Sequence, residues 1–319
     1  MMNVTVSVVC MFSLLGSAAS WGQTFPTKPM RVISSEPGGG ADLVARVVAQ
    51  GLSATLGQQA VVDNRGGSVV IQAENLTKAP PDGHTVLVTG NTIWLFPLLQ
   101  AKSPYDAATD LLPVTMTTFS PAVLAVHPSL PAKSLRELID LAKSRPGELN
   151  YASGALGSTT HLSSELLKSM SRIDIARIPY KGAGPALNAL VAGQVHSMFI
   201  TASSVMPHVK SGRLRALAVA SAEATALAPG LPTMAAAGLP GYESVTMHAV
   251  FAPAKTPRAL VTRLNQEIVQ YINRSDVKEK LFSSGLDLIG ATPERAAQII
   301  QSEVTRMGKV IKDAGIVGE

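Results

Sequence analysis

Apolar and polar positions alternate along this chain with two different periods, which predict strands and helices in turn. Residues 31–35 form an apolar strand candidate, and a glycine-rich turn leads from it into 43–52, where apolar side chains recur on one helical face. Strands are expected again at 60–63 and 85–89, with a helix at 72–79 between them. Strands that alternate with helices are typical of an α/β fold with a mostly parallel sheet.

A second α/β run follows, and the tail of the chain is helical. Further strands are predicted near 123–126 and around Asn150, Ile175, Met198 and Leu217. Ser134 and Glu137 form an S-x-x-E capping box, which marks the start of a helix. Apolar stripes along 260–271 and 300–311 predict two long helices, and Thr292–Pro293 supplies the start of the second.

The length and composition indicate a globular protein of two domains. A chain of 319 residues is long enough for about two domains. With 46% hydrophobic and 15% charged residues, it has the composition of a folded protein rather than a disordered one. Strand-like segments at 111–126 and 214–220 could carry the chain across and back between two lobes.

The N-terminus predicts export. Residues 1–27 carry no charged side chain, and 8–15 is an apolar run of signal-peptide length that is too short to span a bilayer. The segment before it lacks the usual Lys or Arg, but small residues follow, and a cut after Gly22 would leave Gln23 as the new N-terminus. We therefore predict a signal peptide over 1–22. Cys10, the single cysteine, lies in it, so no disulfide is expected in the mature chain.

Charge and hydropathy limit the classes of binding partner that the sequence supports. Only 4% of residues are aromatic and the basic residues are scattered singly, which argues against a nucleic-acid surface. The uncharged stretches 111–132 and 182–209 are interrupted by prolines or by polar residues, so no membrane insertion is expected after signal cleavage. A net charge of +5 favours the approach of small anions without specifying one.

No catalytic or metal-binding signature is found in the sequence. It contains no G-x-S-x-G elbow, no H-E-x-x-H and no phosphate-binding P-loop. Its six histidines are dispersed without metal-ligand spacing, and we interpret them as capping, surface or packed residues. Lys181 could form a Schiff base, but solvated turn lysines are far commoner. We expect a binding protein with no enzyme activity, metal or cofactor.

Two turns could hold an anion. Residues 37–42 (PGGGAD) join a strand to a helix, where glycines expose backbone amides at the positive end of the helix. Residues 151–162 (YASGALGSTTHL) place small hydroxyl residues at a similar strand-to-helix turn. Either could instead be an ordinary tight turn, with Ser158 or Thr159 acting only as a helix cap.

Several motifs together resemble one known family. They are PGGGAD (37–42), PDGHT (81–85), HPSLPAKSLRELIDLAKSRPGELNYAS (127–153), GSTTHL (157–162), PYKGAGPAL (179–187), LPTMAAAGLPGYE (231–243) and FAPAKTP (251–257). From Pro29 to about Ile316 the chain is similar to the substrate-binding proteins of tripartite tricarboxylate transporters, the Bug family.

This resemblance implies a periplasmic, two-lobed α/β receptor of the periplasmic-binding-protein type, with a hinge that the chain crosses twice. Lobe 1 would comprise 23–122 and 221–319, and lobe 2 would comprise 123–220. The receptor would close on a small carboxylate ligand and deliver it to a membrane permease. The implied ligand-binding residues are Gly38, Gly39, Gly40, Asn91, Thr92, Ser153, Gly157, Ser158, Thr159 and Thr201.

Three departures from the family pattern leave the ligand open. Glu36 stands just before the glycine loop, where the family usually has an aromatic residue, and could face solvent, pair with a cation or favour an amide or amine ligand. Leu156 replaces a common side-chain amide and favours a more apolar ligand, and Ile200 replaces a common acidic residue and argues against an amino acid. A ligand sensor of the same fold that signals to a partner protein is the alternative function.

Overall fold

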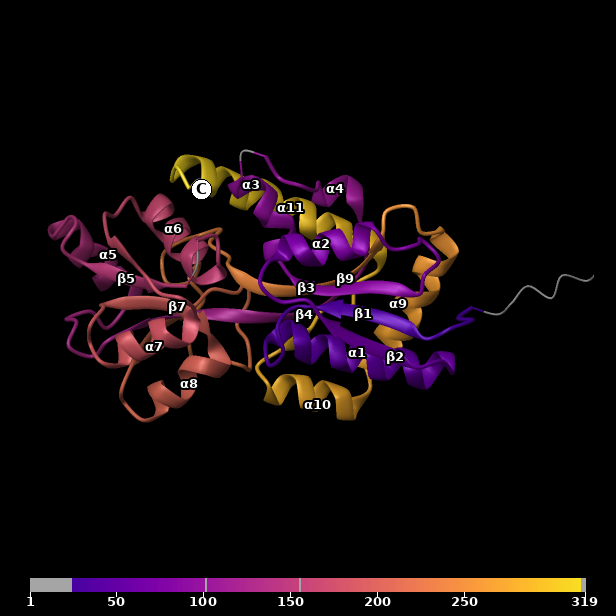
Figure 1. The fold of residues 1–319 in the computed structure, drawn as a ribbon. Helices are drawn as coiled ribbons and strands as arrows, with labels where there is room; N and C mark the ends of the chain where they lie inside the picture. The colour runs from indigo at the N-terminus through magenta and orange to yellow at the C-terminus, as the bar shows by residue number, and fades with distance from the viewer. Residues whose placement is uncertain (1–24, 101, 155, 317–319) are drawn as a thin grey trace, which may run out of the picture.

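The computed structural model describes residues 25–100, 102–154 and 156–316, so the predicted signal peptide and its cut after Gly22 lie outside the described residues. Within these ranges the chain forms two α/β lobes that lie side by side and share one long strand (Figure 1).

Lobe 1 is built on a sheet with the strand order β2-β1-β3-β9-β4. Strands β1, β2, β3 and β4 run in the same direction, and β9 is antiparallel to both of its neighbours. The strands are β1 (Met30–Ser34), β2 (Ala60–Asn64), β3 (Thr85–Gly90), β9 (Val245–Pro253) and part of β4 (Leu111–Val126), to which β10 (Asp287–Leu288) also pairs. The helices are α1 (Gly40–Leu56), α2 (Val69–Thr77), α3 (Thr92–Leu99), α4 (Ala107–Asp110), α9 (Arg258–Ile272), α10 (Ser275–Ser283) and α11 (Pro293–Asp313).

Lobe 2 repeats this design on the order β4-β7-β5-β6, with β8 on the other side of β4. Strands β5, β6 and β7 run parallel to one another, whereas β4 is antiparallel to β7. The strands are β5 (Asn150–Ser153), β6 (Ala176–Pro179), β7 (Ser197–Thr201) and β8 (Arg215–Val219). The helices are α5 (Leu135–Ser144), α6 (Thr159–Ser171), α7 (Ala183–Val191) and α8 (Ala202–Lys210).

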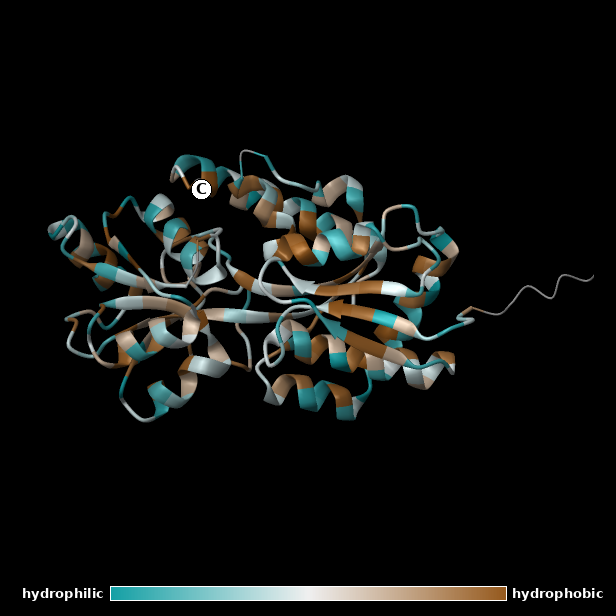
Figure 2. Ribbon diagram, viewed as in Figure 1, coloured by the Kyte–Doolittle hydropathy of each residue, from teal (hydrophilic) through white to brown (hydrophobic). Residues whose placement is uncertain are grey.

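Most of these elements follow from local signals. The Ser134 Oγ accepts the Glu137 N–H at 3.2 Å, and the Thr292 Oγ1 accepts the Arg295 N–H at 3.2 Å, so both predicted caps are confirmed. Helix α2 begins three residues earlier than predicted, because Ser68 caps it through the Val70 N–H. Apolar residues gather on the strands and on the inner sides of the helices (Figure 2). No helix in the part of the chain that the structure describes has the length and apolarity to cross a membrane.

The chain passes twice between the lobes. Strand β4 pairs with β9 as far as Pro121 and with β7 from Ala122, so one continuous strand makes the outward crossing. The return differs from the prediction, because β8 lies wholly in lobe 2 and the chain crosses back after it. There the Ala220 N–H donates to the Ala122 carbonyl at 2.7 Å, and the Ser244 N–H donates to the Ala220 carbonyl at 2.8 Å.

Contacts outside the crossing strands also join the lobes. Helix α11 of lobe 1 extends to α6 of lobe 2 and contacts it, as the yellow helix in Figure 1 shows. In addition, the Tyr242 hydroxyl donates to the Ser163 carbonyl at 2.7 Å, and the Ser163 and Ser244 hydroxyls lie 2.7 Å apart. The start of α6 is therefore anchored to the returning segment of the hinge.

Candidate functional site

The sheet topology brings the same kind of edge from each lobe together. Strand β4 runs parallel to β3, so it leaves lobe 1 at the edge where the parallel strands end. It then enters lobe 2 opposite Thr201, the last residue of β7, because the register pairs Ala122 with Thr201. The carboxyl ends of β1–β3 therefore face those of β5–β7 across the hinge, and ligands of open α/β sheets bind at such edges.

We call this region, formed by residues 34–42, 90–92, 153–154, 156–159 and 201–203, the interlobe site. All of the sequence-predicted site residues follow or end a strand that points to it. Gly38, Gly39 and Gly40 come after β1, Asn91 and Thr92 after β3, Ser153 ends β5, Gly157, Ser158 and Thr159 follow β5, and Thr201 ends β7. The fold thus gathers at one edge residues that are up to 163 positions apart in sequence, from Gly38 to Thr201.

Helix starts with free amides surround the interlobe site. Helices α1, α3, α6 and α8 begin there and α7 begins beside it, and in none of them does the cap side chain accept a backbone N–H of the first turn. Away from the interlobe site, α5 and α11 have the Ser134 and Thr292 caps, whereas α9 and α10 lack a side-chain cap as well. Uncapped first turns offer N–H groups and the positive end of a helix dipole, which together favour a bound anion.

The glycine loop of lobe 1 is only partly available to a ligand. The Gly38 N–H donates to the Asp42 Oδ2 at 2.9 Å, and the same carboxylate accepts from Asn64 and Arg46. Burial would raise the pKa of Asp42, but these hydrogen bonds outweigh it and leave the pKa below its usual value. Within the described chain the Gly39 and Gly40 amides have no such partner, so they are the loop donors that remain.

Glu36 joins two loops of lobe 1. Its Oε1 accepts the Gly67 N–H at 2.6 Å, and this bond lowers the pKa of the carboxyl. Of the three roles left open by the sequence, exposure to solvent fits, because Glu36 is exposed; among the described residues its partner is a backbone N–H and not a cation. Leu156 is 41% exposed at the interlobe site, whereas Ile200 is 3% exposed and packs in the core of lobe 2. Position 200 therefore does not offer its side chain to a ligand.

The lobe 2 turn holds itself together through hydroxyl groups. The buried Ser153 hydroxyl accepts from the Arg177 Nε at 2.8 Å, so it is committed to the protein. The Gly154 N–H donates to the Thr160 Oγ1 at 2.8 Å, and the Ser158 Oγ lies 3.0 Å from that same oxygen. Thr160, which the sequence analysis did not single out, therefore fixes the turn from which Ser158 is presented.

The side-chain amide of Asn91 is also hydrogen-bonded within the protein. Its Nδ2 donates to the Val245 carbonyl at 3.2 Å and to the Glu303 Oε1 at 2.8 Å, while the Trp94 Nε1 donates to the Glu303 Oε2 at 2.7 Å. Burial raises the pKa of Glu303 to about 7 against the effect of these two donors. Asn91 thus shapes the start of α3, whereas Thr92 is exposed there.

Two contacts join the lobes within the interlobe site. A Cβ added to Gly157, whose φ is +73°, would lie 2.1 Å from the Leu99 Cδ1 of lobe 1, so the lobes meet closely at this glycine. The Thr246 Oγ1 donates to the Thr159 Oγ1 at 3.4 Å. The other predicted hydroxyl, that of Thr201, lies 2.9 Å from the Ser204 Oγ at the start of α8.

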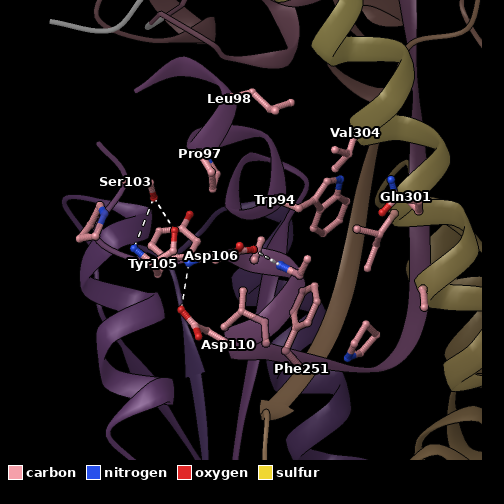
Figure 3. A pocket seen from close by; sticks show the side chains of 17 residues that line it. Trp94, Pro97, Leu98, Ser103, Tyr105, Asp106, Asp110, Phe251, Gln301 and Val304 are labelled. Atoms are coloured by element: carbon pink, nitrogen blue, oxygen red, sulfur yellow. Dashed lines mark hydrogen bonds between the residues drawn. The ribbon is translucent and has the colours of Figure 1, made fainter. Parts of the chain in front are cut away.

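A cavity of about 740 Å³ lies elsewhere, in lobe 1 between α3, α4 and α11 (Figure 3). Trp94, Leu98, Phe251 and Val304 form much of its apolar wall, and Asp106 and Asp110 lie at its polar side. It contains none of the sequence-predicted site residues. Among residues 25–316 as described, no cluster of His, Cys, Asp and Glu could hold a metal ion.

Two α/β lobes, a sheet crossed twice at the hinge and helix starts on the facing edges define a periplasmic solute-binding protein fold. The family model described as "Tripartite tricarboxylate transporter family receptor" matches residues 44–316. The chain belongs to this family, whose members include the Bug proteins, and it has the family's solute-binding role.

Individual relatives are similar over almost the whole chain. Protein BugT of Bordetella pertussis is 36% identical, over 92% of this chain and 91% of the relative. A Rhodopseudomonas palustris protein solved with adipate is 37% identical, has a TM-score of 0.79 and aligns over 92% of this chain and 99% of its own. MatC from the same organism, solved with bound malate, is 31% identical, with a TM-score of 0.75 and coverage of 90% and 100%.

Proposed function

We propose that this protein captures a small organic anion, a carboxylate, at the interlobe site and delivers it to a membrane permease of the tripartite tricarboxylate type. The observation that carries the proposal is the convergence of uncapped helix starts from both lobes on one site. The adipate and malate in the solved relatives support a carboxylate in particular. Family and fold are those of receptors rather than enzymes.

The proposal includes the compartment and the moving parts. The chain would be exported by the signal peptide over 1–22 and act in the periplasm. Lobe 1 (23–122 and 221–319) and lobe 2 (123–220) would rotate about the crossing segments near Ala122 and Ala220. A ligand that contacts both lobes stabilises the closed arrangement, and a permease can recognise that arrangement.

A ligand screen tests the proposed function. Residues 23–319, refolded to remove bound ligand, are mixed with adipate, malate, citrate, benzoate and aspartate, and unfolding is followed by thermal shift. A ligand at a hundredfold excess over its dissociation constant stabilises the native state by about 2.7 kcal/mol. A shift with one class of acid is expected. A folded protein that responds to none of them would contradict the carboxylate proposal.

Delivery needs its own test. We expect that cells lacking this gene lose uptake of the acid that binds, and that a plasmid copy restores it. Normal uptake combined with a lost transcriptional response to the acid would instead favour the sensor function.

The hydroxyl groups at the start of α6 should contribute to ligand affinity. We expect that the double variant Ser158→Ala, Thr159→Ala binds the acid at least about tenfold more weakly, because hydrogen bonds to a charged group contribute about 1.5–3 kcal/mol each. Calorimetric titration measures this. The matched control Ser283→Ala, Ser284→Ala removes two adjacent hydroxyls at the end of α10 and should bind normally. Equal affinity in both double variants would remove Ser158 and Thr159 from the site.

A further inference from the structure

A buried histidine that the sequence analysis set aside lies at the interlobe site. His248 is 4% exposed on β9, in register with Gly90 at the end of β3 and with Thr118 on β4. It therefore sits in the middle of the lobe 1 sheet, at the edge that faces lobe 2. Burial lowers the pKa of this imidazole to about 4, so it is neutral at physiological pH.

One ring nitrogen of His248 is held by the protein. The His248 Nδ1 lies 3.1 Å from the Thr118 Oγ1, and the neighbouring Thr117 hydroxyl donates to the His248 carbonyl at 2.9 Å. The Thr118 hydroxyl has no other acceptor among the described residues, so it is free to donate to Nδ1. A neutral imidazole that accepts at Nδ1 carries its proton on Nε2.

The other ring nitrogen points to the start of α1. A Cβ on Gly40, the first residue of that helix, would lie 3.0 Å from Nε2 and 3.1 Å from Cε1. Because Cα–Cβ bonds in a helix tilt toward its N-terminus, this position lies on the N-terminal side of the first turn. Glycine at position 40 leaves Nε2 uncovered, and Nε2 has no hydrogen-bond partner in the described ranges.

We propose that His248 is a specificity-determining residue: the Thr118 hydroxyl donates to Nδ1, and the neutral Nε2–H donates to a carboxylate oxygen held by the Gly39 and Gly40 amides. The inference deepens the proposed function and rests on it. A neutral N–H next to backbone amides selects by hydrogen-bond geometry and not by charge. An acid whose lobe 1 end is a planar carboxylate therefore binds better than its amide, whose NH₂ group would face this donor.

Two substitutions at position 248 separate the two ring nitrogens. In His248→Asn the amide reaches about as far as Nδ1 and keeps the Thr118 contact, whereas in His248→Gln it reaches about as far as Nε2. Calorimetric titration uses adipate, malate, benzoate and adipamide as probes. We expect the Asn variant to bind the preferred acid about tenfold more weakly, and the Gln variant to remain within about threefold of wild type. Discrimination against adipamide should shrink in the Asn variant.

A third variant leaves the imidazole unchanged. Gly40→Ala places a methyl group against Nε2 without backbone strain, since Gly40 is helical. We expect it to lower the affinity for the acid about as much as His248→Asn does. The matched control is Gly308→Ala, in α11. Its new methyl group meets only Leu98, at ordinary distances of 3.7 Å and 3.9 Å from the two Cδ atoms, and the variant should bind normally. In ¹⁵N-labelled wild type, the Nε2–H resonance that is absent from His248→Asn should shift when the acid is added.

The outcomes distinguish the two levels of proposal. Suppose that wild type binds an acid, that His248→Asn and Gly40→Ala bind it with the same affinity as wild type, and that the Nε2 resonance does not shift. This result would overturn the role of His248 and leave the receptor function standing. A folded wild type that binds none of the acids would overturn the proposed function, and the inference with it.

Discussion

Gly157→Ala is expected to weaken ligand binding about tenfold to a hundredfold. The new methyl group would lie 2.1 Å from the Leu99 Cδ1, and Leu99 is 4% exposed, so it has little room to move aside. Overpacking of this kind costs about 1–3 kcal/mol. Because the two residues belong to different lobes, opening the hinge relieves the overlap, and the cost falls on the closed, ligand-bound arrangement. Calorimetric titration with the acid found in the screen measures the loss.

A matched control separates the lobe contact from backbone strain. The control is Gly212→Ala. Gly212 has a φ of +74°, close to the +73° of Gly157, and a Cβ at position 212 would meet nothing within 4 Å. Both variants should lose about 1–2 kcal/mol of stability from the left-handed backbone, but only Gly157→Ala should lose affinity. Adding Leu99→Ala should restore part of that affinity, and a double-mutant cycle gives the coupling. Equal affinities for Gly157→Ala and Gly212→Ala would show that the contact does not oppose binding.

Glu303→Leu is expected to lower the free energy of unfolding by about 3–5 kcal/mol. The substitution leaves the Trp94 Nε1 and one hydrogen of the Asn91 Nδ2 buried without an acceptor, and each such donor costs about 1–3 kcal/mol. Urea denaturation measures the change. Glu279→Leu, on an exposed face of α10, is the control and should change stability by less than about 0.5 kcal/mol. A loss no larger than the control's would mean that the network does not stabilise the fold.

The pH dependence of Glu303→Gln tests the same carboxyl. Burial raises the pKa of Glu303 to about 7, above its unfolded value, so between about pH 4.5 and pH 7 the unfolded chain releases a proton that the folded chain retains. Wild type should therefore lose stability relative to the Gln variant as pH rises through that window, with little further change above it. The buried histidines His161 and His248, whose pKa values are lowered to about 4, contribute a stability change of opposite sign. Because both proteins contain them, this contribution cancels in the difference between the two free energies of unfolding. A constant difference would place the pKa of Glu303 near its ordinary value.

The sequence alone determined the local elements. The caps at Ser134 and Thr292 and the apolar stripes of α9 and α11 could be predicted because their partners lie within one or two helical turns. The family resemblance added the two-lobed class and the set of site residues, all of which lie at the facing edges of the lobes. Hydrophobic periodicity could not locate the return crossing, because β8 has the same apolar pattern that a strand crossing between the lobes would have.

Only the tertiary structure decided which polar groups are free. Asn91 is one of the ligand-binding residues that the family resemblance implies, yet its amide is bound to Glu303, which is 212 residues away along the chain. The Gly38 amide is taken by Asp42, whereas the Gly39 and Gly40 amides are not. In the sequence, His248 is one of six dispersed histidines. Pairing of β9 with β3 and β4 places its ring next to Gly40, the first residue of α1. Hydrogen-bond partners distant in sequence meet only when the sheet forms, so no local pattern records them.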